Sequence, residues 1–354
     1  MSGKRAMKTR LCELFGIEHP IVQTGMGWVS GARLTAATSA AGGIGILASA
    51  TMTLPQLEQA IRDVRERTDR PFGVNLRTDQ ADIDERVALL VRERVKVASF
   101  AQAPRKEIVR RLKDAGVLTM PTVGARRHAE KVAAMGVDAI IAQGHEGGGH
   151  TGPVPTSLLL PQVTSAVDVP VVGAGGFFDG RGLVAALAYG ASGIAMGTRF
   201  LLTKESTVPD EVKALYLQTQ VTGTVVTRAI DGYPQRVIRT AFVDALERSR
   251  GVLAFARAAG HAWQFRTLTG TSMVALLKEG LAMKKAQELT FGQMAMAANA
   301  PMLTRASMVD GRPEVGILPT GQAVGVIDEL PTVEELVSRI VREAEATLDR
   351  LGAS

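Results

Sequence analysis

The sequence predicts an α/β fold: a closed (β/α)8 TIM barrel with a smaller, mainly helical accessory domain over its C-terminal face. Three observations predict this fold. Eight short apolar runs recur between residues 20 and 197, they start 22 to 31 residues apart, and segments with apolar residues at helical spacing lie between them. A doubly wound open sheet is the competing architecture, but it usually carries its glycine fingerprint after the first strand. Here the densest glycine clusters follow the sixth and seventh runs.

The eight apolar runs are the expected strands of the barrel. In chain order they cover residues 20–25, 43–48, 72–76, 95–100, 117–121, 139–142, 170–175 and 193–197. Residues 54–65 have the helical spacing expected between two strands. Residues 242–249 and 272–280 are also expected to be helical. Thr332 and Glu335 form a capping-box pattern that predicts the start of a terminal helix.

These elements divide the chain into three parts. Residues 1–225 are expected to form the barrel, residues 226–310 a mainly helical domain that covers a substrate, and residues 311–354 a return loop and a C-terminal helix that packs on the barrel. Active-site groups of such barrels gather at the C-terminal ends of the strands.

A glycine-rich stretch, residues 143–152, follows the sixth apolar run and contains His150. An imidazole at a strand end is suited to proton transfer because histidine titrates near neutral pH. The alternative is that three successive glycines make a turn which the histidines cap. His145 lies in the same stretch and is a candidate for substrate binding. His19 precedes the first strand and is expected at the bottom of the barrel, where residues serve stability.

The ends of the seventh and eighth runs predict a phosphate site. Gly175, Gly176 and Gly197 allow a ligand to approach the backbone closely, Thr198 adds a hydroxyl, and Arg199 adds a guanidinium. Barrels commonly hold a phosphate between these two loops, so we expect a phosphate-bearing cofactor there.

Five motifs occur in the order in which a known family carries them. They are Pro20-Ile-Val-Gln-Thr-Gly-Met-Gly-Trp28, Phe72-Gly-Val-Asn75, Gln143-Gly-His-Glu-Gly-Gly-Gly-His-Thr-Gly152, Gly173-Ala-Gly-Gly176 and Met196-Gly-Thr-Arg-Phe200. They resemble the nitronate monooxygenase (2-nitropropane dioxygenase) family of flavoproteins. The resemblance implies an FMN-binding barrel with a small helical domain over the flavin, and it assigns the catalytic role to His150. The cofactor contacts it implies are Gly25, Met26, Gly27, Asn75, Gln143, Gly148, Gly149, Gly175, Gly176, Gly197 and Thr198.

Other stretches point to particular branches of that superfamily. Gly25-Met-Gly-Trp28 resembles the flavin-dependent enoyl-acyl-carrier-protein reductases rather than the nitronate monooxygenases themselves. Residues 147–153, 174–182, 223–226, 231–234 and 316–322 resemble the actinobacterial members that act on CoA thioesters in breakdown of the steroid C and D rings. This resemblance implies α,β-desaturation of a bulky steroid-derived CoA thioester in the degradation of hexahydroindanone-propanoyl-CoA, and it leaves the exact acyl group open. Three other reactions remain alternatives: nitronate oxidation, reduction of an enoyl thioester by a nicotinamide, and quinone reduction. The alternative that is not an enzyme is a flavin-binding sensor without turnover.

The positive charge of the chain is concentrated after the barrel. The formal net charge is +6, and residues 225–290 contain ten Lys/Arg against five Asp/Glu. A solvated helical face explains any single one of these residues, but a basic cluster beside an active-site mouth suits the phosphates of CoA. The candidate substrate contacts are Arg236, Arg239, Lys284 and Lys285, and Gln322 in the return loop is expected to point toward the flavin.

Composition excludes several other classes of function. Aromatic residues make up 4% of the chain, too few for a base-stacking surface, and no recognised nucleic-acid motif is present. No apolar stretch approaches the roughly 20 residues that span a bilayer. Cys12 is the only cysteine, which fits a reducing cytoplasm, and no His/Cys/carboxylate spacing predicts a metal site. The sequence leaves the oligomeric state open, a homo-oligomer included.

Overall fold

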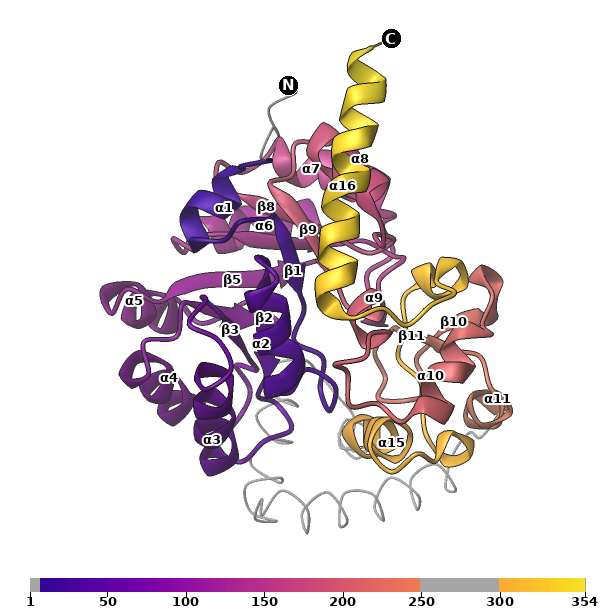
Figure 1. Cartoon of the computed structure of the whole chain (residues 1–354). Helices are drawn as coiled ribbons and strands as arrows, with labels where there is room; N and C mark the ends of the chain where they lie inside the picture. Colours follow the sequence, from indigo (N-terminus) through magenta and orange to yellow (C-terminus); the bar gives the residue numbers. More distant parts are fainter. Residues whose placement is uncertain (1–6, 249–298, 354) are drawn as a thin grey trace.

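The computed structural model describes residues 7–248 and 299–353, and its main feature is a closed barrel of parallel strands (Figure 1). The barrel strands are β1 (Ile21–Gln23), β2 (Ile44–Ala48), β3 (Gly73–Leu76), β4 (Val97–Phe100), β5 (Leu118–Val123), β6 (Ile140–Gln143), β8 (Val171–Ala174) and β9 (Gly193–Met196). Pairing of Val22 with both Ile44 and Ala195 closes the ring. Each strand overlaps one of the eight apolar runs, and β5 extends two residues beyond its run; the predicted TIM barrel is confirmed.

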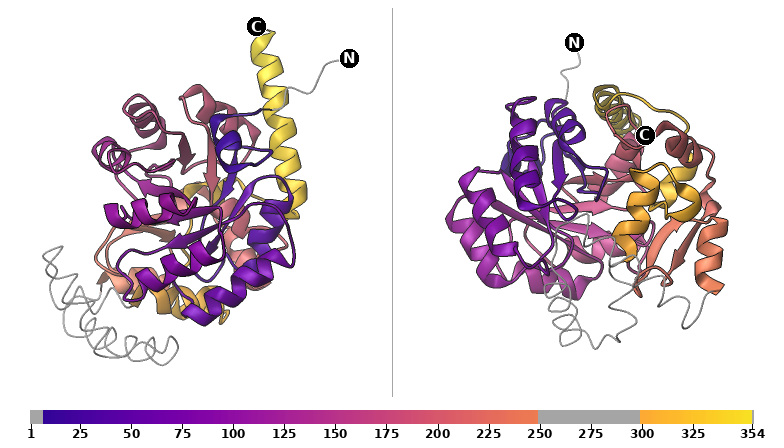
Figure 2. Two further views of the ribbon diagram at one scale, coloured as in Figure 1. Left: turned by 90° about the vertical axis from the view of Figure 1, so that its left-hand side faces the viewer. Right: turned by 90° about the horizontal axis from the view of Figure 1, so that it is seen from below.

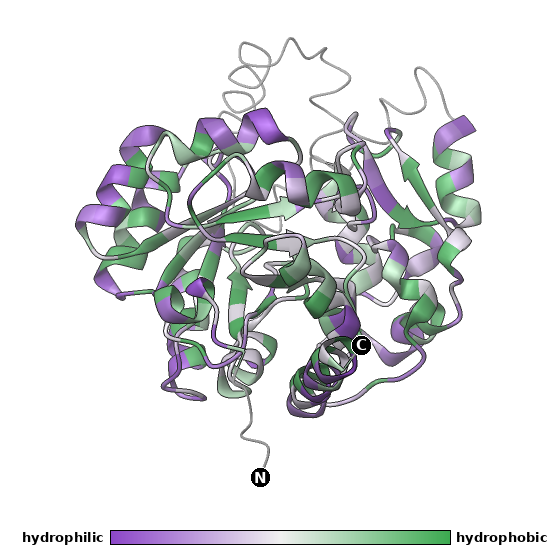
Figure 3. Cartoon of the chain, turned by 90° about the horizontal axis from the view of Figure 1, so that it is seen from above, coloured by the Kyte–Doolittle hydropathy of each residue, from purple (hydrophilic) through white to green (hydrophobic). Residues whose placement is uncertain are grey.

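Helices between the strands form the outer layer of the barrel, as the two further views in Figure 2 show. They are α2 (Ala32–Ala40), α3 (Leu54–Arg65), α4 (Ile83–Arg92), α5 (Lys106–Asp114), α6 (Arg126–Ala133), α7 (Thr156–Thr164) and α8 (Gly180–Ala188). The single turn α9 (Thr198–Leu201) follows the last strand, β9. Figure 3 shows that the strands are mainly apolar, whereas the helices carry polar residues on their outer sides. This pattern is typical of parallel strands that are buried on both faces.

A short helix closes the N-terminal end of the barrel. Helix α1 (Arg10–Phe15) buries Leu11 and Phe15 completely, in the same apolar cluster as Val22, Ile46 and Val172 from the strands. The cluster fills the lower interior with side chains, so the barrel is a packed core and any ligand site lies at the other end.

The elements that follow the barrel begin with an antiparallel hairpin. Strands β10 (Thr224–Thr227) and β11 (Gln235–Ile238) pair with each other, and β11 also pairs with β7 (Gly149–His150), which belongs to the glycine-rich stretch. Helix α10 (Asp210–Leu217) and the 3-10 turn η1 (Val221–Gly223) precede the hairpin, and α11 (Ala241–Arg248) and α15 (Asn299–Met308) follow it. The expected helix at 272–280, with Lys284 and Lys285, lies outside the described residues.

The chain then returns to the barrel through two 3-10 turns, η2 (Pro313–Val315) and η3 (Gln322–Val326). Helix α16 (Val333–Gly352) begins at the predicted capping box, in which Thr332 accepts from the Glu335 N–H and the Glu335 carboxylate accepts from the Thr332 N–H. It packs closely on α8, where a Cβ at Gly180 would lie 2.3 Å from the Ala344 nitrogen. Within the described ranges, every helix is too short or too polar to cross a membrane.

Candidate active site

The predicted contacts from β1, β3 and β9 come together at the C-terminal end of the barrel. Gly25 lies so close to Asn75 that a Cβ on it would be 2.5 Å from the Asn75 Cβ. A Cβ on Gly197 would lie 3.3 Å from the Met26 sulfur. Because strands far apart in sequence end here, their loops form one continuous surface above the core.

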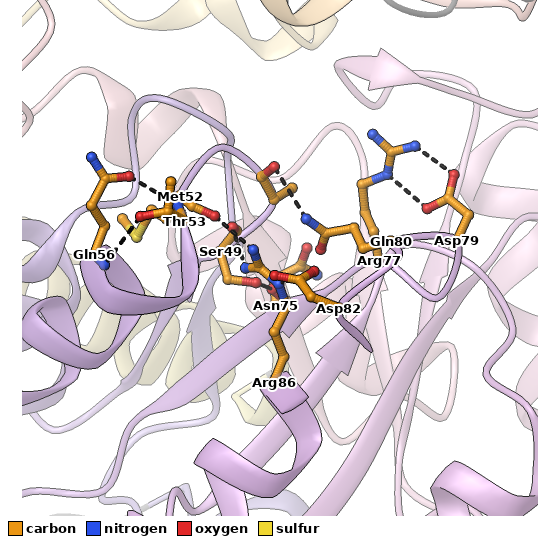
Figure 4. Close-up of polar contacts among 11 residues, drawn as sticks. Ser49, Met52, Thr53, Gln56, Asn75, Arg77, Asp79, Gln80, Asp82 and Arg86 are labelled. Atoms are coloured by element: carbon orange, nitrogen blue, oxygen red, sulfur yellow. Dashed lines mark hydrogen bonds and ion pairs between the residues drawn. The ribbon is translucent and has the colours of Figure 1, made fainter. Parts of the chain in front are cut away.

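Asn75 is held by a hydrogen-bond network that includes the loop after β2 and Arg86 of α4 (Figure 4). The Ser49 hydroxyl donates to the Asn75 carbonyl at 2.6 Å. The Asn75 side-chain amide donates to Ser99 Oγ at 3.3 Å. The buried Arg86 guanidinium donates to the carbonyls of Ser49 and Met52 at 2.9 and 2.7 Å. Arg86 on α4 therefore fixes the loop after β2, and that loop fixes Asn75.

The glycine-rich stretch folds back over the end of β6. The Gln143 side-chain amide donates to the carbonyl of His150 at 2.7 Å. A Cβ at Gly148 would lie 2.5 Å from the carbonyl carbon of Thr320, so the stretch also packs against the return loop. Gly149 has a φ of +64°, in the left-handed region that favours glycine. Together these contacts direct β7 toward the hairpin.

Glu146 connects this stretch to the turn after β8. Its carboxylate accepts from the Thr156 N–H at 3.0 Å and from the Thr156 hydroxyl at 2.7 Å. The same hydroxyl is 3.0 Å from the Gly175 carbonyl oxygen. Gly175 and Gly176 have φ of +96° and +82°, so this turn requires two consecutive left-handed residues without side chains.

The return loop completes the surface next to β9. Thr198 Oγ1 accepts from the Gly321 N–H at 2.9 Å, and the Gln322 N–H donates to the Glu146 carbonyl at 2.9 Å. Arg199 lies elsewhere: its guanidinium is buried 3.7 Å from Glu329, just before α16, and burial lowers its pKa to about 10. The Arg199 guanidinium, which was expected at a phosphate, therefore lies at Glu329 instead.

His150, the candidate catalytic residue, has a side chain that is 63% accessible. Its Nε2 lies 2.8 Å from Asp231 Oδ2 and 3.1 Å from Gln235 Nε2. The Asp231 side chain is only 6% accessible. The ring of Tyr233 meets the imidazole edge-on, with centroids 6.0 Å apart. Burial and the nearby Asp231 raise the pKa of Tyr233.

The basic candidates occupy different environments. Arg236 is 3% exposed, and its guanidinium donates to the His145 carbonyl at 3.1 Å and to Thr224 Oγ1 at 2.9 Å. Burial lowers its pKa. Arg239 is exposed and pairs with Asp244 at 2.9 Å. His145 Nδ1 lies 2.8 Å from the Gly152 carbonyl. This geometry favours a positioning role for Arg236 and leaves Arg239 accessible to a ligand.

The sequence analysis did not identify four residues that the structure places at the site: Asp231, Gln235, Glu146 and Thr156. Asp231 lies in a stretch that carries the family resemblance, but it meets His150 across 81 positions. Glu146 lies next to His145, and its carboxylate could have been recognised as the partner of an N-terminal Thr156 N–H in α7.

Comparison with known proteins agrees with the fold and the motifs. The nitronate monooxygenase family model matches residues 8–87 and 81–343. The chain is 56% identical over 347 residues to a (3aS,4S,5R,7aS)-5-hydroxy-7a-methyl-1-oxo-octahydro-1H-indene-4-carboxyl-CoA dehydrogenase of Rhodococcus jostii, covering 98% of both chains. It is 55% identical over 350 residues to the dehydrogenase of the same name from Mycobacterium tuberculosis, covering 98% of this chain and 99% of that one.

Among solved structures, FabK from Thermotoga maritima superposes with a TM-score of 0.81 at 34% identity, covering 98% of this chain and 99% of FabK. The nitroalkane oxidase from Streptomyces ansochromogenes gives a TM-score of 0.75 at 28% identity, covering 96% of this chain and 99% of that one. Since the family model spans most of the chain, the protein belongs to the nitronate monooxygenase family.

Proposed function

We propose that the protein is an FMN-dependent oxidoreductase that introduces an α,β double bond into a steroid-derived CoA thioester with two fused rings. The observation that carries the proposal is the 56% and 55% identity, over 98% of the chain, to two dehydrogenases of an octahydro-indene-4-carboxyl-CoA. Those names attach the thioester carbonyl to a ring carbon. The acyl group we propose therefore follows them, since the sequence alone leaves the exact acyl group open.

Residues at the barrel face fit FMN. The FMN phosphate would bind between the turn after β8 and the start of α9. Backbone N–H groups would be supplied by Gly175 and Gly176, which have positive φ, and by Gly197, and a hydroxyl by Thr198. Met26, Asn75 and Gln143 would contact the ring system, and the Ser49–Arg86 network holds Asn75 ready for it. When bound, FMN supplies a hydride acceptor.

The residues of this chain supply the proton transfer. A thioester carbonyl makes the hydrogen on the α-carbon acidic, and His150 accepts that proton. The C–H electron pair of the β-carbon leaves as hydride, and the α C–H electron pair forms the new double bond. The accessible imidazole of His150 can reach a substrate that lies over the barrel mouth.

Anaerobic mixing of the purified protein with candidate substrates, followed by flavin absorbance, tests the proposal. The indene-carboxyl-CoA thioester is expected to bleach the flavin quickly and to yield an enoyl thioester two hydrogens lighter. Fast bleaching by a nitronate with none by the thioester would overturn the proposal. If every compound, NADH and NADPH included, leaves the bound flavin oxidised, a flavin-binding sensor becomes the better reading.

Reduction of an enoyl thioester is the second candidate function. It is favoured by Gly25-Met-Gly-Trp28, which resembles the flavin-dependent enoyl-acyl-carrier-protein reductases. The same groups would act in reverse, with His150 returning a proton to the α-carbon. Rapid bleaching by NADH or NADPH, with turnover of the enoyl ester and none of the saturated ester, identifies this direction. Bleaching by a nicotinamide with turnover of quinones alone would identify a quinone reductase.

A further inference from the structure

We infer that Asp231, on the hairpin after the barrel, fixes the tautomer of His150: it holds the proton on Nε2, so that Nδ1 is the atom that accepts the proton of the substrate. The inference deepens the proposed function and rests on it in one respect, the role of His150 in proton transfer. It makes Asp231 a positioning residue that lies outside the eight barrel strands.

The contact between the His150 and Asp231 side chains is short, and the Asp231 carboxylate is shielded from solvent whereas the imidazole is exposed. His150 Nε2 and Asp231 Oδ2 are 2.8 Å apart, with the carboxylate 6% accessible and the imidazole 63% accessible. An ionised carboxylate only accepts hydrogen bonds, so a neutral His150 in this contact must carry its proton on Nε2. Its Nδ1 then keeps a lone pair. Among residues 7–248 and 299–353, Nδ1 has no hydrogen-bond partner.

Strand pairing brings the two groups together. In the β7–β11 ladder, Gln235 lies opposite His150 and Arg236 opposite Gly149, and the Thr151 N–H donates to the Pro234 carbonyl at 3.1 Å. The Gln235 side-chain amide donates to Asp231 Oδ2, the same oxygen that faces the imidazole.

The other carboxylate oxygen is used in the hairpin turn. Asp231 Oδ1 accepts from the Tyr233 N–H at 3.1 Å, and the Tyr233 ring lies at 73° to the imidazole. The carboxylate thus has three contacts: the turn N–H, the Gln235 amide and the His150 imidazole. A purely structural Asp231 would matter only through the first two.

Comparison of Asp231→Asn with Asp231→Ala separates these two roles. Both are made in a Gln235→Ala background, so that the Gln235 amide cannot donate to Nε2 once the carboxylate that accepts from Nε2 has been removed. Asn still accepts from the Tyr233 N–H, but its NH₂ group donates to Nε2 and moves the imidazole proton to Nδ1. Ala loses the turn contact but leaves either tautomer accessible.

We expect the Asn variant to be the slower of the two. Its kcat should fall by about 10³–10⁴-fold relative to Gln235→Ala, the loss typical of a wrong histidine tautomer, with KM nearly unchanged. The opposite order, or equal rates, overturns the inference and leaves Asp231 as a turn residue. FMN content and thermal unfolding of each variant confirm that it is folded.

A second readout does not depend on turnover. In protein labelled with ¹⁵N-histidine, the signals of His150 are identified by their loss in His150→Asn. At a pH where the imidazole is neutral, we expect a protonated Nε2 in the wild type and a protonated Nδ1 in Asp231→Asn. If the wild type fails to reduce flavin with the thioester, the proposed function fails, whereas the tautomer spectrum still decides the role of Asp231. A wild-type spectrum with the proton on Nδ1 overturns the inference by itself.

Discussion

Gln143 and His150 are joined across the glycine-rich stretch by a hydrogen bond of 2.7 Å, from the side-chain amide of the first to the carbonyl of the second. Gly147 lies directly over this amide, since a Cβ there would be 2.7 Å from Gln143 Nε2. The end of β6 is therefore in direct contact with the residue proposed for proton transfer. A side chain that we expect against the flavin ring also sets the position of His150.

His150→Asn is expected to slow flavin reduction by the thioester about 10²–10⁴-fold, the loss typical of a missing general acid or base, with FMN content near normal. His128→Asn, on the exposed side of α6, is the matched control and should behave like wild type. Stopped-flow absorbance under anaerobic conditions measures both. An unchanged rate in His150→Asn would make His150 a structural residue.

The purified protein is expected to be yellow with about one FMN per chain, and Gly176→Ala is expected to weaken FMN binding. Gly136→Ala is a close control because Gly136 has a φ of +86° against +82° for Gly176, and neither glycine has an atom closer than 3.8 Å to an added Cβ. Both variants should lose about the same stability, roughly 1 kcal/mol from left-handed strain. Only Gly176→Ala should lose FMN affinity, measured by flavin fluorescence titration. Equal affinities, or recovery of FAD in place of FMN, would contradict the assignment.

The barrel could be predicted from the sequence because each of its strands is a local apolar run that is buried on both faces. The short strand β7 could not, since Gly149–His150 has no strand propensity of its own and forms only by pairing with β11. The meeting of His150 with Asp231 depends on the same long-range pairing. The position of the Arg199 side chain could not be predicted from the sequence either, because neighbouring residues on a helical turn point in different directions. Thr198 contacts the return loop, whereas Arg199 contacts Glu329.

His19 gives a prediction on stability and pH. Burial lowers its pKa, against the raising effect of Glu18 and Glu345. The unfolded state therefore binds the proton more readily, so the free energy of unfolding should be highest above the ordinary histidine pKa of about 6.5 and should fall as pH drops below it. In His19→Gln this part of the pH dependence should disappear. Urea unfolding at pH 7.5 and 5.5 measures it. An equal drop in both proteins would assign the effect to other groups.

The two described arginines among the candidate substrate contacts should respond differently to neutralisation. Arg239→Gln is expected to raise KM for the CoA ester with little change in kcat. The reason is that an exposed cation would bind the CoA phosphates equally well in the ground state and in the transition state. KM of the wild type should also rise with salt, since salt screens exposed charges. Arg236→Gln should instead lower kcat, because its buried guanidinium holds the His145 carbonyl in the stretch that positions His150.

Asp244→Asn is the control for Arg239, with the opposite sign. It releases Arg239 from its 2.9 Å ion pair, so KM for the CoA ester should fall or stay constant while kcat is retained. Neutralising Lys284 and Lys285, which lie outside the described residues, completes the set. If KM is unchanged in every one of these variants, or if the free acid is used as well as its CoA ester, recognition does not involve the CoA phosphates. A small nitronate or quinone then becomes the better substrate class, because neither needs a cation outside the barrel mouth.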